Sequence, residues 1–245
     1  SQQNKKIEIR CIDIPSSQSG ALATLVNLLP ESDYPDTDDI RSFDKLLSTE
    51  RKRFYGRKKA LKIIELLEKE SKINDTVFHK YLGENYEEFF HQITGAKIIL
   101  NGSFTILNSE GMESRELYMY GNLKKITSEN PGVPLIAQFG RAHVALNYQQ
   151  KWLHLNNWKS LAARLNTNED SPVKGKVCSI VNFYANEIQN EYRDSTLYKP
   201  VIRKEYLPLF LEYSKTPLTL FKLDVEDSPF IDMTDKFQYL IINKY

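Results

Sequence analysis

Short apolar runs alternate with helical stretches along the chain, and this alternation most constrains the fold that the chain can adopt. "KIEIRCIDI" (Lys6 to Ile14) and "KGKVCSIVNFY" (Lys174 to Tyr184) are rich in apolar residues, as is typical of strands entering a buried sheet. Single strands followed by helices favour an α/β fold with a mainly parallel sheet flanked by helices. We expect the strands at 6–14, 133–139, 175–183, 218–223 and 237–243.

A long charged stretch with helical periodicity interrupts this alternation at 43–93. Gly56 predicts a kink or a helix break within it, and a second break is expected near Gly83. We therefore expect one α/β domain over 1–245, with a helical insert at about 43–93 that forms a lid beside the strand ends. The basic run "ERKRFYGRKK" is typical of a solvated helix face. The alternatives are a nucleic-acid patch and an interaction surface at 51–59.

Composition and missing motifs exclude several classes of protein. The net charge of +1 gives no global preference for nucleic acid or for an anionic membrane. No apolar run is long enough for a transmembrane helix. The two cysteines, Cys11 and Cys178, lie in apolar runs and are expected to be buried free thiols. The spacing of Cys and His predicts no metal site, and the P-loop, dinucleotide, nucleophile-elbow and zincin motifs do not occur.

The segment "PLIAQFGRAHVAL" (Pro134 to Leu146) predicts a buried strand that ends on Gly140 and then presents Arg141 and His143. Ligands of parallel α/β sheets bind at the carboxyl ends of strands, and Asp13 would lie at the same edge. An imidazole suits a general base, because its ordinary pKa is near neutrality. The structural alternatives are a packing histidine after a turn, an aspartate that caps a helix, and a salt bridge at Arg115.

Three segments share the order and rough spacing of the motifs of one superfamily. "IEIRCIDIP" is similar to a strand that ends in Gly-x-Asp, although here a cysteine replaces the glycine. "SRELYMYGNL" is similar to an Arg-Asp-x-x-Met-x-x-Asn helix, and "PLIAQFGRAHV" is similar to a strand that delivers a catalytic histidine. Together they resemble the erythromycin-esterase, ChaN and Tiki superfamily. The matching positions are Cys11, Asp13, Arg115, Glu116, Met119, Asn122 and His143.

The resemblance implies a parallel α/β core with helical insertions and a cleft at the strand ends. It also implies a hydrolase that cleaves an ester or peptide bond with a water molecule activated by histidine. The catalytic residues would be His143, Asp13 and Glu116. The substrate-binding residues would be Arg115, Arg141 and Asn122.

Two departures from the family pattern support a second hypothesis. Family esterases carry a Glu-x-x-His segment before the first of these strands, and nothing in 1–245 matches it. Their histidine strand reads His-Asn-x-His, whereas Gly140 and Arg141 occupy the first two positions here. The alternative is a non-catalytic module of the same fold that binds a small molecule or haem through His143. A Glu-x-x-His segment upstream in the natural gene would favour the enzyme.

The expected partner is a small-molecule or peptide substrate, with no nucleic acid and no integral membrane segment. The sequence identifies no cofactor and no oligomeric state. The chain starts without Met, which allows for a longer natural chain of which this is the C-terminal part, or for export after removal of a signal peptide. The frequent Lys, Asn, Ile and Tyr residues are typical of an AT-rich bacterial genome.

Overall fold

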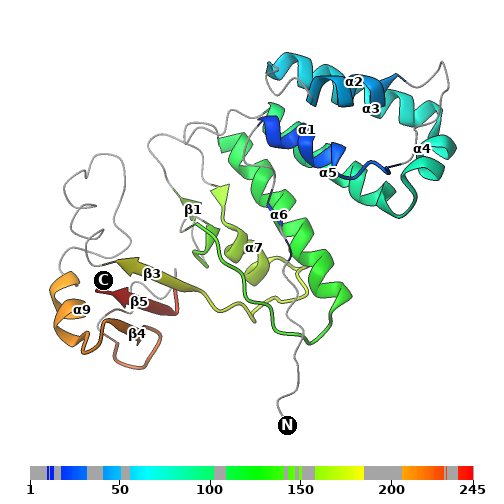
Figure 1. The fold of residues 1–245 in the computed structure, drawn as a ribbon. Coiled ribbons are helices and arrows are strands. Elements are labelled where there is room, and N and C mark those ends of the chain that lie inside the picture. The colour runs from blue at the N-terminus through cyan, green and yellow to red at the C-terminus, as the bar shows by residue number, and fades with distance from the viewer. Residues whose placement is uncertain are drawn as a thin grey trace, which may run out of the picture. The chain divides into compact units, whose positions relative to one another are not determined.

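The structure of the chain is a computed structural model (Figure 1). It describes residues 10, 12–13, 18–31, 41–50, 56–101, 109–140, 143–146, 149–150, 158–184, 206–228, 230 and 237–244. The chain divides into two compact units, Ser1–Met119 and Tyr120–Tyr245. The described part of the first unit is helical, and that of the second combines helices with a small sheet, so the chain is an α/β protein.

Glycine or asparagine marks the limits of two central helices of the first unit. Helix α3 (Arg57–Ile73) begins after Gly56, and Asn74 separates it from α4 (Asp75–Leu82). Helix α4 ends at Gly83, whose φ of 53° is costly for residues with a side chain. The other described elements are α1 (Gln18–Val26), α2 (Ser42–Glu50), the 3-10 turn η1 (Gly83–Asn85), α5 (Tyr86–Asn101) and α6 (Ser109–Glu129), which continues into the second unit.

The helical stretch predicted at 43–93 is confirmed, as are the breaks at Gly56 and Gly83. Residues 51–55 lie outside the described part of the chain. These helices pack with α1, so the predicted insert is part of a larger helical unit. Its role as a lid remains a prediction.

An aromatic cluster fills the centre of this helical unit. Phe43 of α2 has no exposed surface, and its ring centroid lies 4.8 Å from that of Phe78, 5.0 Å from Tyr81 and 6.2 Å from Phe89. Aliphatic side chains from three other helices surround it: Leu22, Leu25, Ile64, Leu67 and Ile93. Because α3 buries its apolar stripe in this core, its opposite face is left to solvent.

The second unit contains a three-stranded sheet in the order β3-β5-β4. Strand β3 (Ile180–Tyr184) runs parallel to β5 (Tyr239–Asn243), and β4 (Leu218–Lys222) runs antiparallel to β5. Helix α9 (Leu207–Tyr213) packs on one face of the sheet through Phe210, which is fully buried against Phe221. The unit also contains α7 (Leu161–Thr167) and the short pair β1 (Gln149–Gln150) and β2 (Trp158–Lys159).

The sheet is mixed, so the prediction of a mainly parallel sheet is correct only in part. The strands expected at 175–183, 218–223 and 237–243 are present, although β3 begins only at Ile180. A parallel pair needs a crossover connection, and α9 lies in the one between β3 and β5. Strand β4 returns beside β5 in the opposite direction, which periodicity along one strand does not reveal.

The prediction of a strand at 133–139 is wrong, because this segment forms neither helix nor strand. Gly132, with a φ of 78°, makes a turn after α6, and Pro134 lacks an N–H for a strand ladder. No strand of the described part pairs with the segment, and Ile136 is 102% exposed. The strand predicted at 6–14 falls mostly outside the described residues, and Arg10, Ile12 and Asp13 are not in a strand.

The prediction of a buried thiol is also wrong at Cys178, which is exposed. It lies two residues before the start of β3, in a stretch without regular structure. Desolvation by its neighbours, together with the charge of Asp224, raises the pKa of the thiol. Cys11 lies outside the described residues.

Candidate functional site

Asp13 and Arg115, which are 102 residues apart in the sequence, form an ion pair in the first unit. The guanidinium of Arg115 donates from Nε to Oδ1 of Asp13 at 2.8 Å and from Nη2 to Oδ2 of the same carboxylate. This two-bond geometry fixes the plane of the guanidinium and leaves Nη1 outside both bonds. The pair is partly shielded, since the side chains are 28% and 33% exposed.

The electrostatic environment of Arg115 favours the protonated, positively charged form of its side chain. The hydrogen bonds to Asp13 raise the pKa of Arg115, and the negative charges of Asp13 and Glu116 raise it further, whereas burial lowers it. Glu116 is fully buried. A carboxylate in that position influences the guanidinium through its charge, without being open to a substrate in this structure.

Helix α6 carries the other predicted residues of the Arg-Asp-x-x-Met-x-x-Asn pattern. Met119 is fully buried, and Asn122 is partly exposed. Arg115, Met119 and Asn122 occupy positions i, i+4 and i+7, so they lie along one face of the helix. Asn122 falls in the second unit and Arg115 in the first.

His143 is a buried side chain of the second unit, with 7% of its surface exposed. Its backbone N–H donates to the carbonyl of Gly140 at 2.9 Å, and its ring centroid lies 6.4 Å from that of Phe139. A Cβ at Gly140 would lie 3.6 Å from Cδ2 of the imidazole, so the glycine leaves space beside the ring.

Two serines anchor the residues that follow His143. Ser179 Oγ donates to the carbonyl of Val144, and Ser160 Oγ donates to the carbonyl of Ala145. Ser160 also caps α7, because its Oγ accepts the N–H of Ala163 at 3.1 Å. The backbone that carries His143 is therefore held in place by neighbouring segments of the second unit.

The structure thus joins Asp13 and Arg115 in an ion pair, and the negative charge of Glu116 acts on the same guanidinium. His143 belongs to the other unit, so its convergence with Asp13 and Arg115 remains a prediction. Arg141 lies outside the described residues. Among the described residues there is no group of three or more His, Cys, Asp or Glu side chains placed to hold a metal ion. No described helix is long and apolar enough to span a bilayer.

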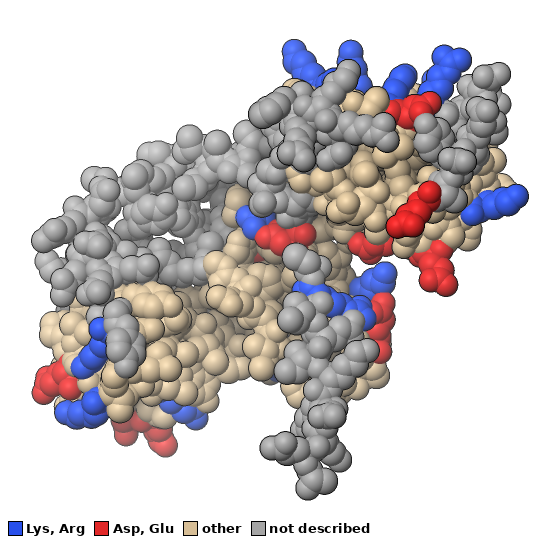
Figure 2. Space-filling view, viewed as in Figure 1, with Lys and Arg blue, Asp and Glu red and all other residues tan. Residues whose placement is uncertain are grey.

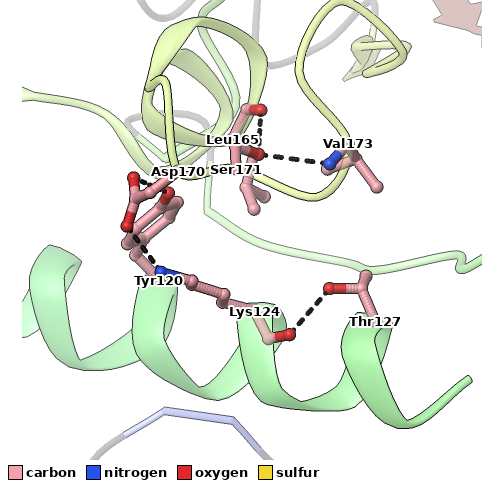
Figure 3. Close-up of polar contacts among 7 residues, drawn as sticks. All are labelled: Tyr120, Lys124, Thr127, Leu165, Asp170, Ser171 and Val173. Carbon is pink, nitrogen blue, oxygen red and sulfur yellow. Dashed lines mark hydrogen bonds and ion pairs between the residues drawn. The ribbon is translucent and has the colours of Figure 1, made fainter. Parts of the chain in front are cut away.

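A second polar cluster, which sequence reasoning missed, joins α6 to the turn after α7 (Figure 3). Asp170 accepts hydrogen bonds from the hydroxyl of Tyr120 at 2.7 Å and from Nζ of Lys124 at 2.6 Å. Lys124 and then Tyr120 lower the pKa of the Asp170 carboxyl through these bonds. Tyr120 and Lys124 are spaced i, i+4 on α6, but no local pattern in the sequence points to an acceptor near position 170.

Comparisons with known proteins give one similarity in structure. No family model matches the chain, and no curated protein matches it. The chain is similar to an erythromycin esterase. The similar structure is a histidine-to-asparagine mutant of the esterase EreC in its open conformation, with 13% identity and a TM-score of 0.49. The similarity covers 95% of this chain and 67% of that chain.

Proposed function

We propose that the chain is a hydrolase of the erythromycin-esterase-like type, which cleaves an ester or peptide bond with a water molecule activated by His143. The observation that carries the proposal is the two-bond ion pair between Asp13 and Arg115. It joins the first two of the three segments on which the resemblance rests, across 102 residues of sequence. The third segment supplies the histidine.

Each side chain has a role that follows from its chemistry. Arg115, oriented by Asp13, presents Nη1 to an oxyanion or to an acidic group of the substrate. His143 accepts a proton from water as the general base. Glu116 reinforces the positive charge of Arg115 from inside the first unit. We propose that Asn122 and Arg141 contact the substrate, which is a small molecule or a peptide.

Hydrolysis of a panel of chromogenic esters and short peptides by the purified chain tests the proposal. His143→Ala should lower kcat about 10²- to 10⁴-fold, the usual contribution of a general base. His79→Ala is the matched control, because His79 is an exposed histidine of α4. Equal rates for the wild type and His143→Ala would contradict the proposal, provided that circular dichroism shows both to be folded.

A non-catalytic binding module is the second candidate, and one observation favours it. The charge of Arg115 is already matched by Asp13, so a substrate carboxylate gains less there than at an unpaired arginine. Such a module would bind a small molecule or haem through His143. Titration with haem, followed by absorbance, separates the two candidates. Haem binding that His143→Ala abolishes, with no hydrolysis by the wild type, would favour the module.

A further inference from the structure

Helix α3 presents a row of lysines on its outer face. Lys58, Lys62, Lys69 and Lys72 are exposed, and together with Glu65 they are spaced i, i+4, i+7, i+11 and i+14. This spacing keeps all five side chains on one face of the helix. At 1.5 Å per residue the row is about 21 Å long. We call these four lysines the lysine row.

Two of the three glutamates of α3 are engaged away from the row. Of the glutamates of α3, Glu68 pairs with Lys97 of α5 at 2.9 Å. Glu70 is buried and accepts backbone N–H groups at the start of α2. Only Glu65 remains beside the row. Within the described part of the chain, no hydrogen bond or ion pair reaches the four ammonium groups of the row.

More positive charge surrounds the row. Lys59 is exposed next to it, and Arg41 and Lys45 are exposed on or beside α2, which packs against α3. Figure 2 shows lysine and arginine side chains projecting from the edge of the helical unit where α2 and α3 lie. A chain with a net charge of only +1 therefore concentrates cations on one surface.

The chemistry of this surface fits the phosphates of a lipid bilayer. Lysine attracts phosphate through its charge and imposes no fixed hydrogen-bond geometry. The row has no Arg, Asn or Gln, the side chains that typically recognise the base edges of nucleic acids. An apolar side chain marks one end of the row, since Ile73 is 70% exposed at the end of α3. Basic residues combined with aliphatic ones are typical of surfaces that bind the bilayer interface.

We propose that the lysine row and Ile73 form a docking surface for an anionic membrane, on which the chain binds peripherally. Each lysine near such a surface strengthens binding about fivefold, so four lysines give appreciable affinity at low salt. The attraction falls as ionic strength rises, because exposed charges are screened. Nothing in this proposal depends on the hydrolase activity.

Co-sedimentation with vesicles tests the proposal. The probes are phosphatidylcholine vesicles with and without phosphatidylserine, and the protein is the full chain. The wild type should bind only the anionic vesicles, and salt should release it. The triple variant K62Q/K69Q/K72Q should bind about a hundredfold more weakly. Ile73→Ser alone should weaken binding by up to about tenfold, which an attraction to phosphate alone would not produce.

The matched control is K80Q/K125Q/K176Q, which removes the same charge from exposed lysines outside the row. It should bind nearly as well as the wild type. Equal losses in the two triple variants would overturn the proposal, since net charge would then explain the binding. Binding to duplex DNA or heparin but not to anionic vesicles would also overturn it, and so would binding to none of these. Circular dichroism of each variant establishes that it is folded.

Discussion

The ion pair between Asp13 and Arg115 can be tested by a double-mutant cycle. Asp13→Asn keeps the shape of the side chain but removes its charge. Arg115→Lys keeps the charge but removes the planar guanidinium, which donates two hydrogen bonds to the carboxylate. Hydrogen bonds to charged groups contribute about 1.5 kcal/mol each at the low end, so two bonds give about 3 kcal/mol. The side chains are 28% and 33% exposed, and water competes for them. We therefore expect a coupling energy of about 1.5 kcal/mol.

Urea unfolding followed by circular dichroism measures this coupling. The pair belongs to Ser1–Met119, so the transition of that unit should shift to lower urea with its slope unchanged if the two units unfold separately. Lys174 and Glu169 provide the control pair. They form an ion pair at 2.5 Å in the second unit, with exposures of 44% and 90%, and the same cycle should give a coupling of only about 0 to 0.5 kcal/mol.

Additive effects of Asp13→Asn and Arg115→Lys would refute the reasoning. A coupling energy below about 0.5 kcal/mol would mean that water replaces the pair at little cost. Arg115 would then be available to bind a substrate, and Asp13 would not be its positioning residue. A coupling well above about 3 kcal/mol would instead indicate a pair buried more deeply than its exposures suggest.

Three further predictions concern the first unit. Phe43→Ala should destabilise it by about 3–5 kcal/mol in urea unfolding, because a fully buried ring leaves a cavity, and a loss below about 1 kcal/mol would contradict this packing. Glu70→Ala should cost about 1–3 kcal/mol in the same assay, because the buried N–H of Ser42 loses its acceptor, while a neutral result would mean that water replaces the carboxylate. The hydrogen bond to Asp75 raises the pKa of Tyr86 from 10.0 to about 12, so this bond stabilises the fold below pH 10 and its contribution is lost as the pH rises through 12. In an NMR titration, Asp75→Asn should bring the Tyr86 pKa back toward 10, and an unchanged value would rule out Asp75 as the cause.

Local patterns predicted the elements that depend on local physics. Gly83 ends a helix with a φ of 53°, a backbone conformation that glycine tolerates and other residues avoid. Gly56 precedes α3 in an ordinary extended conformation, and there the low helix propensity of glycine is the signal. The strands at 218–222 and 239–243 were recognised from apolar runs, which report burial along one strand. Neither a glycine nor an apolar run indicates the direction of a neighbouring strand, so the sequence does not predict the antiparallel pairing of β4 with β5.

Contacts between distant segments were predicted only where several motifs occurred in order. That order placed Asp13 and Arg115 in one site, and the structure joins them in an ion pair. The alternative of a salt bridge at Arg115 describes the same contact. The bond between Tyr120 and Asp170 spans 50 residues and has no such motif, so no pattern in the sequence indicates it. The segment 133–139 is a related case, since its apolar pattern does not reveal whether a partner strand is present.

The exposed segment after α6 has a practical consequence for the behaviour of the protein in solution. Val133, Leu135 and Ile136 are 57%, 43% and 102% exposed, and no charged residue separates them. Exposed apolar segments of this kind lack the gatekeeper charges that oppose self-association. Light scattering should therefore show self-association that increases with protein concentration. Ile136→Lys, which adds a charge in the middle of the segment, should raise the solubility without affecting the packing of either unit.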